Sequence, residues 1–389
     1  MVKFRDICTK IGSGATPKGG KEAYCEEGIT LIRSQNVLDF SFSENGLAYI
    51  NDEQADKLKN VIVEDMDVLI NITGDSVART CMVDKKYLPA RVNQHVCIVR
   101  ANQEKVVPSY LLYILQQKKN YLLQMASGGA TRNALTKDMI CELEVELPSI
   151  AEQRKIVAIL DDIQEKIKLN AQINNNLEEQ AHAFYKSWFV DFEPFGGCMP
   201  KDWTAGKLKD ILELKRTPIK AGENTQLPYL PIDVIPMHTL AVTEFKSNDE
   251  AQSSLITFDK DDILIGAMRV YFHRVVIAPC SGITRTTCFT LRPYKQEYLS
   301  YGLLCCNQDS SIEYAQTTSK GSTMPYAVWE GGLGDMDIVI PPVEVVRSFN
   351  EIVLPMIRQI QNSYFENTSL TRLRDNLLPR LMSGNLDVP

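Results

Sequence analysis

Two long stretches of the chain place apolar residues at alternating spacings of four and three. In the first stretch the recurring positions are Ile156, Leu160, Ile163, Ile167, Asn170, Asn174, Leu177, Ala181, Phe184 and Trp188. Adding 193 to each number gives the second stretch, with Phe349, Val353, Met356, Ile360, Ser363, Asn367, Leu370, Arg374, Leu377 and Leu381. This spacing is typical of a coiled-coil seam. It predicts one long helix over residues 150–192 and a second over residues 343–384.

Both seams carry polar residues near the middle. If the helices pack antiparallel, Asn170 and Asn174 come level with Ser363 and Asn367, so that polar side chains meet while the apolar ends match. A polar layer of this kind fixes the register of two helices at some cost in stability. About 38 helical residues form a rod of roughly 55 Å, which is long for a surface helix of a globule of about 150 residues. The length favours mutual packing over the alternative, in which each helix packs only on its own globule.

The helices belong to a longer internal duplication, which decides the architecture. The matching segments are Phe4–Ile7 with Leu208–Ile211, Asp67–Ile70 with Asp262–Ile265, Ser127–Thr131 with Ser319–Thr323, and Glu144–Pro148 with Asp337–Pro341. The segment Glu193–Gly197 marks the restart. The predicted order is a globule over residues 1–149, a helix over 150–192, a globule over 193–342 and a helix over 343–384. Duplicated halves with antiparallel helices also predict a pseudo-twofold axis across the helix pair.

Each globule mixes short strands with helices. Apolar runs such as Val68–Ile72 and His95–Val99 predict strands, and Ser109–Gln124 predicts a helix. The second globule repeats this pattern, with predicted strands at Ile263–Ile265, Arg274–Ala278 and Cys288–Arg292 and a predicted helix near Tyr298–Asn307. We therefore expect an α+β fold with many loops. Pro355 and Pro379 are expected to kink or end the second long helix locally.

Composition narrows the function. The chain has 389 residues, of which 44% are apolar, so it can bury more than one core. No run of about 18 apolar residues is present and the start lacks the apolar core of a signal peptide, so we expect a cytoplasmic protein without a membrane span. The ten cysteines form no CxxC pair and the four histidines no HExxH motif, which argues against a metal site. The net charge of −7 disfavours DNA binding unless basic residues gather on one face.

Searches for catalytic motifs give nothing. The chain lacks the Asn/Asp-Pro-Pro-aromatic motif of adenine methyltransferases, a GxGxxG turn and a GxSxG elbow. The Gly-rich segment Gly12–Lys21 lacks the spacing of a P-loop. Asp67 and Asp262 precede predicted strands, where turns favour aspartate. We therefore expect no catalytic residue, no metal ligand and no cofactor in this chain.

Both globules carry basic, amide and hydroxyl side chains in loops, at matching points of the duplication. Arginine pairs with guanine, asparagine and glutamine pair with adenine, and lysine, serine and threonine hold phosphates, so these types suit a DNA-reading surface. Solvated loops without a function are the alternative for any single residue. The candidates are Lys18, Lys21, Arg33, Gln35, Asn36, Thr73, Arg79, Arg91, Asn93, Gln94, Arg132 and Asn133 in the first globule, and Lys215, Arg216, Lys220, Arg269, Tyr271, Arg274, Arg285, Thr286, Lys320 and Thr323 in the second.

Several motifs together resemble those of type I restriction-modification specificity subunits. They are Gly12–Lys18, Pro148–Ile156 with its Glu-Gln pair, Ser187–Pro194 and Leu381–Gly384. The second copy departs from the pattern, because Val345-Val346 replaces the Glu-Gln pair. The resemblance covers essentially the full length.

The resemblance implies that each globule is a target recognition domain for one half of a split double-stranded DNA site, while the helices set the spacer. It also implies two methyltransferase subunits and restriction (motor) subunits as partners, which would hold S-adenosylmethionine, ATP and magnesium. An autonomous DNA-acting enzyme and a coiled-coil scaffold that binds only protein are the alternatives. Turnover by the purified chain alone would indicate the first of them.

Overall fold

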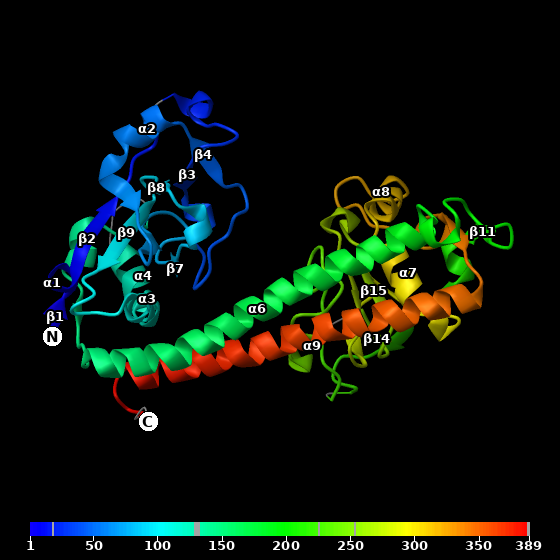
Figure 1. The fold of residues 1–389 in the computed structure, drawn as a ribbon. Helices are drawn as coiled ribbons and strands as arrows, with labels where there is room; N and C mark the ends of the chain where they lie inside the picture. Colours follow the sequence, from blue (N-terminus) through cyan, green and yellow to red (C-terminus); the bar gives the residue numbers. More distant parts are fainter. Residues whose placement is uncertain (18, 128–132, 225, 253, 387–389) are drawn as a thin grey trace. The chain divides into compact units, whose positions relative to one another are not determined.

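The computed structural model describes residues 1–17, 19–127, 133–224, 226–252 and 254–386, without the side chains of residues 20 and 21 (Figure 1). Internal contacts divide the chain into two compact units. The first unit consists of Met1–Glu165 with Arg372–Pro389, and the second of Lys166–Thr371. The division passes through both long helices, α6 (Ile150–Phe189) and α9 (Val343–Met382). Each unit therefore contains one globule and a stretch of both helices.

In the first unit the globule has ten strands and five α-helices among the described residues. The strands are β1 (Val2–Lys3), β2 (Cys8–Ser13), β3 (Ile29–Ile32), β4 (Ala48–Ile50), β5 (Ile62–Val63), β6 (Val68–Asn71), β7 (Thr80–Met82), β8 (Ala90–Val92), β9 (Val96–Ala101) and β10 (Glu144–Val145). The helices are α1 (Phe4–Ile7), α2 (Asp52–Lys57), α3 (Pro108–Gln117), α4 (Lys119–Ser127) and α5 (Lys137–Cys141).

In the second unit the described part of the globule has nine strands and two α-helices. The strands are β11 (Thr204–Lys207), β12 (Leu212–Lys215), β13 (Thr217–Ile219), β14 (Leu255–Phe258), β15 (Ile263–Gly266), β16 (Val275–Ile277), β17 (Gly282–Arg285), β18 (Cys288–Pro293) and β19 (Asp337–Ile340). The helices are α7 (Leu299–Cys306) and α8 (Asp309–Thr317). The expected α+β class is confirmed in both units.

The two globules share one sheet frame, defined as the antiparallel sheet β2-β9-β6-β7 in the first and β12-β18-β15-β16 in the second. A two-stranded ribbon accompanies each frame, β1-β10 and β11-β19. The remaining sheets, β4-β3-β8-β5 and β13-β14-β17, also correspond. The parallel pairing of β3 with β8 in the first globule corresponds to a parallel bridge between Tyr229 and Ile283 in the second. Strand β13 is an additional strand of the second globule. The internal duplication predicted from the sequence is therefore a duplication of topology.

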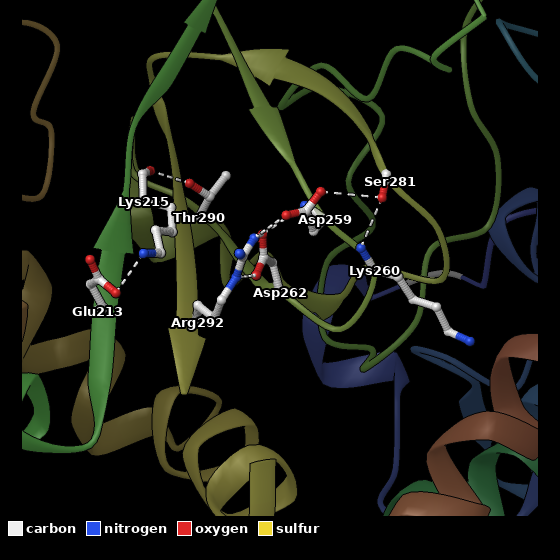
Figure 2. A network of polar contacts seen from close by, with 8 residues as sticks. All are labelled: Glu213, Lys215, Asp259, Lys260, Asp262, Ser281, Thr290 and Arg292. Carbon is white, nitrogen blue, oxygen red and sulfur yellow. Dashed lines mark hydrogen bonds and ion pairs between the residues drawn. The ribbon is translucent and has the colours of Figure 1, made fainter. Parts of the chain in front are cut away.

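An ion pair between neighbouring strands recurs at the same point of both frames. In the second unit Arg292 of β18 donates from Nε to Oδ1 of Asp262 at 2.7 Å and from Nη2 to Oδ2 at 2.9 Å (Figure 2). In the first unit Arg100 of β9 makes the same two contacts with Asp67, at 2.7 and 2.8 Å. Both aspartates are at most 1% exposed. The aspartate before each central strand thus stabilises the frame, beyond the turn preference expected from the sequence.

The residues at the start of α6 cap this helix and attach it to the first globule. Ser149 and Glu152 form a capping box, in which the Glu152 N–H donates to Ser149 Oγ and the Ser149 N–H donates to Glu152 Oε2. Gln153 is fully buried, accepts a hydrogen bond from the Val107 N–H at 2.9 Å and donates to the carbonyls of Lys105 and Pro148. The Glu-Gln pair therefore fixes both the first turn of α6 and its attachment to the first globule.

The predicted polar layer is present in the second unit, where α6 and α9 lie side by side (Figure 1). Asn170 donates from Nδ2 to Oδ1 of Asn367 at 2.9 Å and to Glu366 at 2.6 Å, and Asn367 donates to the Ile167 carbonyl at 3.1 Å. Asn174 is 1% exposed, and neither its amide nitrogen nor its amide oxygen has a hydrogen-bond partner. The antiparallel pairing of Asn170 with Asn367 is confirmed.

The two prolines do not end α9, which runs unbroken from Val343 to Met382. The expectation that Pro355 or Pro379 would end it was wrong. Both prolines are exposed, and so are Glu351 and Asp375 four residues before them. Water can therefore take the hydrogen bond that each missing N–H leaves unmade.

The repeated ion pair leads to a stability prediction. Replacing Asp262 by alanine should lower the free energy of unfolding of the second unit by about 3 kcal/mol, because Arg292 loses the buried carboxylate. All three tryptophans of the chain, Trp188, Trp203 and Trp329, belong to this unit. Tryptophan fluorescence in a denaturant titration therefore measures the effect.

The matched control is Lys246→Ala, which removes an ion pair with Asp233 whose carboxylate is largely exposed. It should cost less than about 1 kcal/mol. Equal losses in the two variants would contradict a special role for the buried pair.

Candidate nucleic-acid interface

Candidate residues of the first globule converge on one corner of its frame. The Thr16 hydroxyl donates to Gln94 Oε1 at 2.5 Å, the Gln94 amide contacts His95 Nε2 at 2.7 Å, and His95 Nδ1 lies 2.6 Å from Thr73 Oγ1. Since the amide nitrogen of Gln94 is a donor, Nε2 accepts and the ring proton lies on Nδ1. Asn133 joins the corner, because its carbonyl accepts a hydrogen bond from the N–H of the glycine that follows Thr73.

A neighbouring loop holds Arg33, Gln35 and Asn36. Asn36 is fully buried, accepts from the Arg33 N–H at 3.0 Å and donates to the Ser43 carbonyl at 2.9 Å. Gln35 donates to the Gly46 carbonyl at 3.1 Å, and the Arg33 guanidinium donates to the same carbonyl. In the free protein these side chains build the loop from within, and Asn36 has no surface to offer a ligand.

The other candidates of the first globule differ in exposure. Arg91 is 8% exposed, donates to the carbonyls of Ala55 and Ala90, and its burial lowers its pKa. Asn93 is also 8% exposed and accepts from the His95 N–H at 3.0 Å. Arg79 is half-buried with no side-chain partner among the described residues. Lys18 and Arg132 lie outside the described residues, as does the side chain of Lys21. Part of the predicted match Ser127–Thr131 lies outside them as well.

Three candidates of the second globule surround a pocket. Arg216, Thr286 and Lys320 are exposed and line a cavity of about 470 Å³ at the end of strands β12 and β18. The walls are largely apolar and include Phe289 and Trp329. No motif in the sequence marks these aromatic residues, although Trp329 follows shortly after the predicted Lys320–Thr323 loop. The aromatic lining of the pocket was therefore not predicted.

The remaining candidates of the second globule are either exposed or engaged within the protein. Arg269, Arg285, Lys220 and Thr323 are exposed, with no side-chain partner among the described residues, and Tyr271 is 44% exposed. Two other basic side chains are already paired inside the protein. Lys215 forms an ion pair with Glu213 at 2.6 Å (Figure 2), and Arg274 donates to the Ile232 carbonyl while burial lowers its pKa.

The two corners are equivalent positions of the frame. In the first globule Thr73 bridges Ala134, and the Leu135 N–H donates to the Ile72 carbonyl at 2.8 Å. In the second, Met268 bridges Tyr326, and the Ala327 N–H donates to the Ala267 carbonyl, also at 2.8 Å. Candidate residues thus gather where the same strands of the frame end in both units.

Comparisons with known proteins agree with this architecture. Residues 1–179 match the family model "Type I restriction modification DNA specificity domain". The match covers 179 of the 389 residues. The relatives extend the similarity over both halves. The Type I restriction enzyme MjaIX specificity subunit of Methanocaldococcus jannaschii is 26% identical over 74% of this chain and 71% of its own length.

Two further similarities cover almost the whole chain. The Type I restriction enzyme HindI specificity subunit of Haemophilus influenzae is 21% identical over 92% of this chain and 94% of its own length. The crystal structure of the type I restriction-modification S subunit from M. genitalium superposes with a TM-score of 0.67, covers 98% of this chain and 95% of the other, and is 16% identical. The chain is thus similar to type I specificity subunits over almost its whole length, as the motifs indicated.

Metal-binding clusters do not emerge from the described part of the chain. No group of three or more histidine, cysteine, aspartate or glutamate side chains is placed there to hold a metal ion. Every helix in the described ranges is also too short or too polar to cross a lipid bilayer.

Three of the four histidines belong to the second unit. His273 is 6% exposed, with Nε2 2.8 Å from the Asn307 carbonyl and Nδ1 3.3 Å from Asp309. Its ring centroid lies 4.7 Å from that of His238. Burial lowers the pKa of His273, and burial together with His273 lowers the pKa of His182. The fold therefore favours the neutral form of both rings.

The lowered pKa of His273 makes stability depend on pH. Because the unfolded chain binds protons more readily, the stabilisation is present above the unfolded pKa of about 6.5 and is lost as the pH falls through and below it. We expect the melting temperature of the second unit, followed by tryptophan fluorescence, to fall between pH 7.5 and pH 5.5. His273→Asn, which tolerates the left-handed backbone at this position (φ +50°), should reduce this fall. An equally large fall in the variant would exclude His273 as its source.

Proposed function

We propose that this chain is the DNA-reading subunit of a type I restriction-modification complex and recognises a bipartite double-stranded site. The observation that carries the proposal is the repeated frame, whose equivalent corners collect amide and hydroxyl side chains in the first globule and basic and hydroxyl side chains in the second. The family match of residues 1–179 supports it, because the matched domain is named for DNA specificity. In this proposal each globule reads one half-site.

Charge supports a DNA-facing role for the corner of the second globule. The chain carries a net charge of −7, yet Arg216, Arg269, Arg285 and Lys320 are exposed and have no ion-pair partner among the described residues. Elsewhere in this unit basic side chains are paired with carboxylates, as Lys207 is with Asp337 and Lys246 with Asp233. Unpaired cations at a loop corner attract phosphates, whereas paired ones do not.

We assign no catalytic step to this chain. Two methyltransferase subunits would bring S-adenosylmethionine and modify a base, and restriction subunits would bring ATP and magnesium. The exposed faces of α6 and α9 would hold the methyltransferase subunits, and the length of the helices would set the spacer between the half-sites. An autonomous enzyme remains the less favoured alternative, since the chain lacks the catalytic motifs that were sought.

The first test is the methylation pattern of cells that express this chain with a type I methyltransferase subunit. Genomic sequencing should show methylation at one split motif. Arg285→Ala should change or relax one half of the motif and weaken binding to the preferred site by roughly 5- to 150-fold, because a bidentate base contact contributes about 1–3 kcal/mol. Lys295→Ala, at an exposed lysine of the same unit outside the corner, is the control. If Arg285→Ala changes neither the base preference nor the affinity, Arg285 is not part of the interface.

The ruler role has its own test. Inserting seven residues after Asn170 and seven after Ser363 keeps the four-three seam in step and lengthens both helices by about 10 Å. The methylated motif should then gain roughly three base pairs of spacer with unchanged half-sites. The same insertion in the exposed segment 196–199 should leave the spacer as it was. An unchanged spacer after the helix insertions would contradict the ruler.

A further inference from the structure

The pocket of the second globule has the composition of a site for a single nucleotide. Its volume of about 470 Å³ lies in the range of small-ligand pockets, about 300–1,000 Å³, and is too small for a duplex. Phe289 and Trp329 form part of its wall, with ring centroids 6.2 Å apart and planes at 70°. Both rings are nearly buried, at 3% and 5% exposed, so they form the floor of the pocket. The exposed ring of Tyr326, which also lines the pocket, is the one on which a nucleobase can stack, whatever the base.

The mouth of the pocket carries positive charge, which complements the negative charge of a phosphate. Arg216 and Lys320 line it from two separate segments, and neither side chain has an ion-pair partner among the described residues. Thr286 and Thr287 also line it and offer hydroxyls that can donate to or accept from a base edge. Tyr326, which is 46% exposed, covers one side and is held by reciprocal backbone hydrogen bonds with Lys320, both 2.9 Å.

The frame does not require these aromatic residues. The register of the two frames makes Cys97 equivalent to Phe289, Ala134 to Tyr326 and Lys137 to Trp329. The first unit therefore builds the same sheet with none of the three rings. Trp329 is nevertheless firmly held in the second unit, because a Cβ on Gly334 would lie within 2.8 Å of its indole. Phe289 and Trp329 also pack in the hydrophobic core of the unit, whereas the ring of Tyr326 is exposed at the pocket, where a ligand can cover it.

We propose that this pocket binds one nucleobase together with its neighbouring phosphate, with the base on Tyr326 above the floor of Trp329 and Phe289 and the phosphate on Arg216 and Lys320. The proposal rests on the proposed function in that DNA is the expected source of the nucleotide, as an unpaired or extruded base. A free mononucleotide has the same chemistry and is the second possible source. The first unit has no equivalent aromatic set, so the two DNA-reading corners differ in this ability.

The test uses the full chain and intrinsic tryptophan fluorescence, since Trp329 lines the pocket while Trp188 and Trp203 do not. One arm adds a single-stranded octathymidylate, and the other adds dTMP or dAMP. We expect quenching that disappears in Trp329→Phe. Tyr326→Ala should weaken binding of the quenching ligand by roughly 5- to 100-fold, as expected for one lost base–aromatic contact of about 1–3 kcal/mol. Quenching by the oligonucleotide alone assigns the source to DNA, and quenching by mononucleotides alone assigns it to free nucleotide.

Matched control variants distinguish binding in the pocket from binding to surface charge, and loss of binding from misfolding. Tyr294→Ala removes a more exposed tyrosine (61%) that does not line the pocket, and Lys260→Ala removes an exposed lysine elsewhere in the unit. Both should bind like the unaltered chain, and thermal unfolding checks that Trp329→Phe is folded. Absence of quenching in both arms, or equal weakening by Tyr294→Ala and Tyr326→Ala, would overturn the pocket. Duplex binding and the methylation motif would survive that result, so failure of the pocket and failure of the proposed function are distinguishable.

Discussion

The packing of α6 on α9 is the constraint on which the rest of the structure depends. Each compact unit is completed by a helix segment from a distant part of the chain. Leu378 and Leu381 of α9 lie in the core of the first unit, together with Leu160 of α6. Tyr185 and Phe189 of α6 lie in the core of the second unit against Phe349 of α9. Neither globule can bury its helix-facing surface without a segment that belongs to the other half of the sequence.

This arrangement explains which parts of the fold the sequence predicted. The four-three spacing predicted both helices and the pairing of Asn170 with Asn367, because a seam that repeats over about 38 residues leaves little choice of partner. Matching segments predicted the repeated frame, because strands and their turns are specified locally. The ion pairs of Asp67 and Asp262 were not predicted, since Arg100 and Arg292 come about 30 residues later and only the strand pairing brings them together.

The candidate surface was less predictable for the same reason. A sequence shows that Asn36 and Arg91 are polar, but the fold decides that they are buried and satisfy backbone groups of their own globule. The pocket was not predicted either, because only the fold brings Trp329 of the hydrophobic core and the exposed Tyr326 to the wall of one cavity. The prediction that Pro355 would end the helix failed. The free-energy cost of a proline within a helix depends on whether that helix face is exposed to water, which the sequence does not state.

The polar layer lowers the stability of the helix pair but fixes the register in which α6 and α9 pack. Asn170 and Asn367 satisfy each other, whereas Asn174 is buried with both ends of its amide unpaired, which costs free energy. A leucine there would remove that cost and bury more apolar surface. It would also extend an apolar seam whose four-three repeat matches itself after every seven residues, so that the helices could slide by a heptad. Since each unit takes core residues from both helices, a slipped register would pull those residues out of both cores. The layer therefore favours one register of the two helices, although an entirely apolar seam would be more stable.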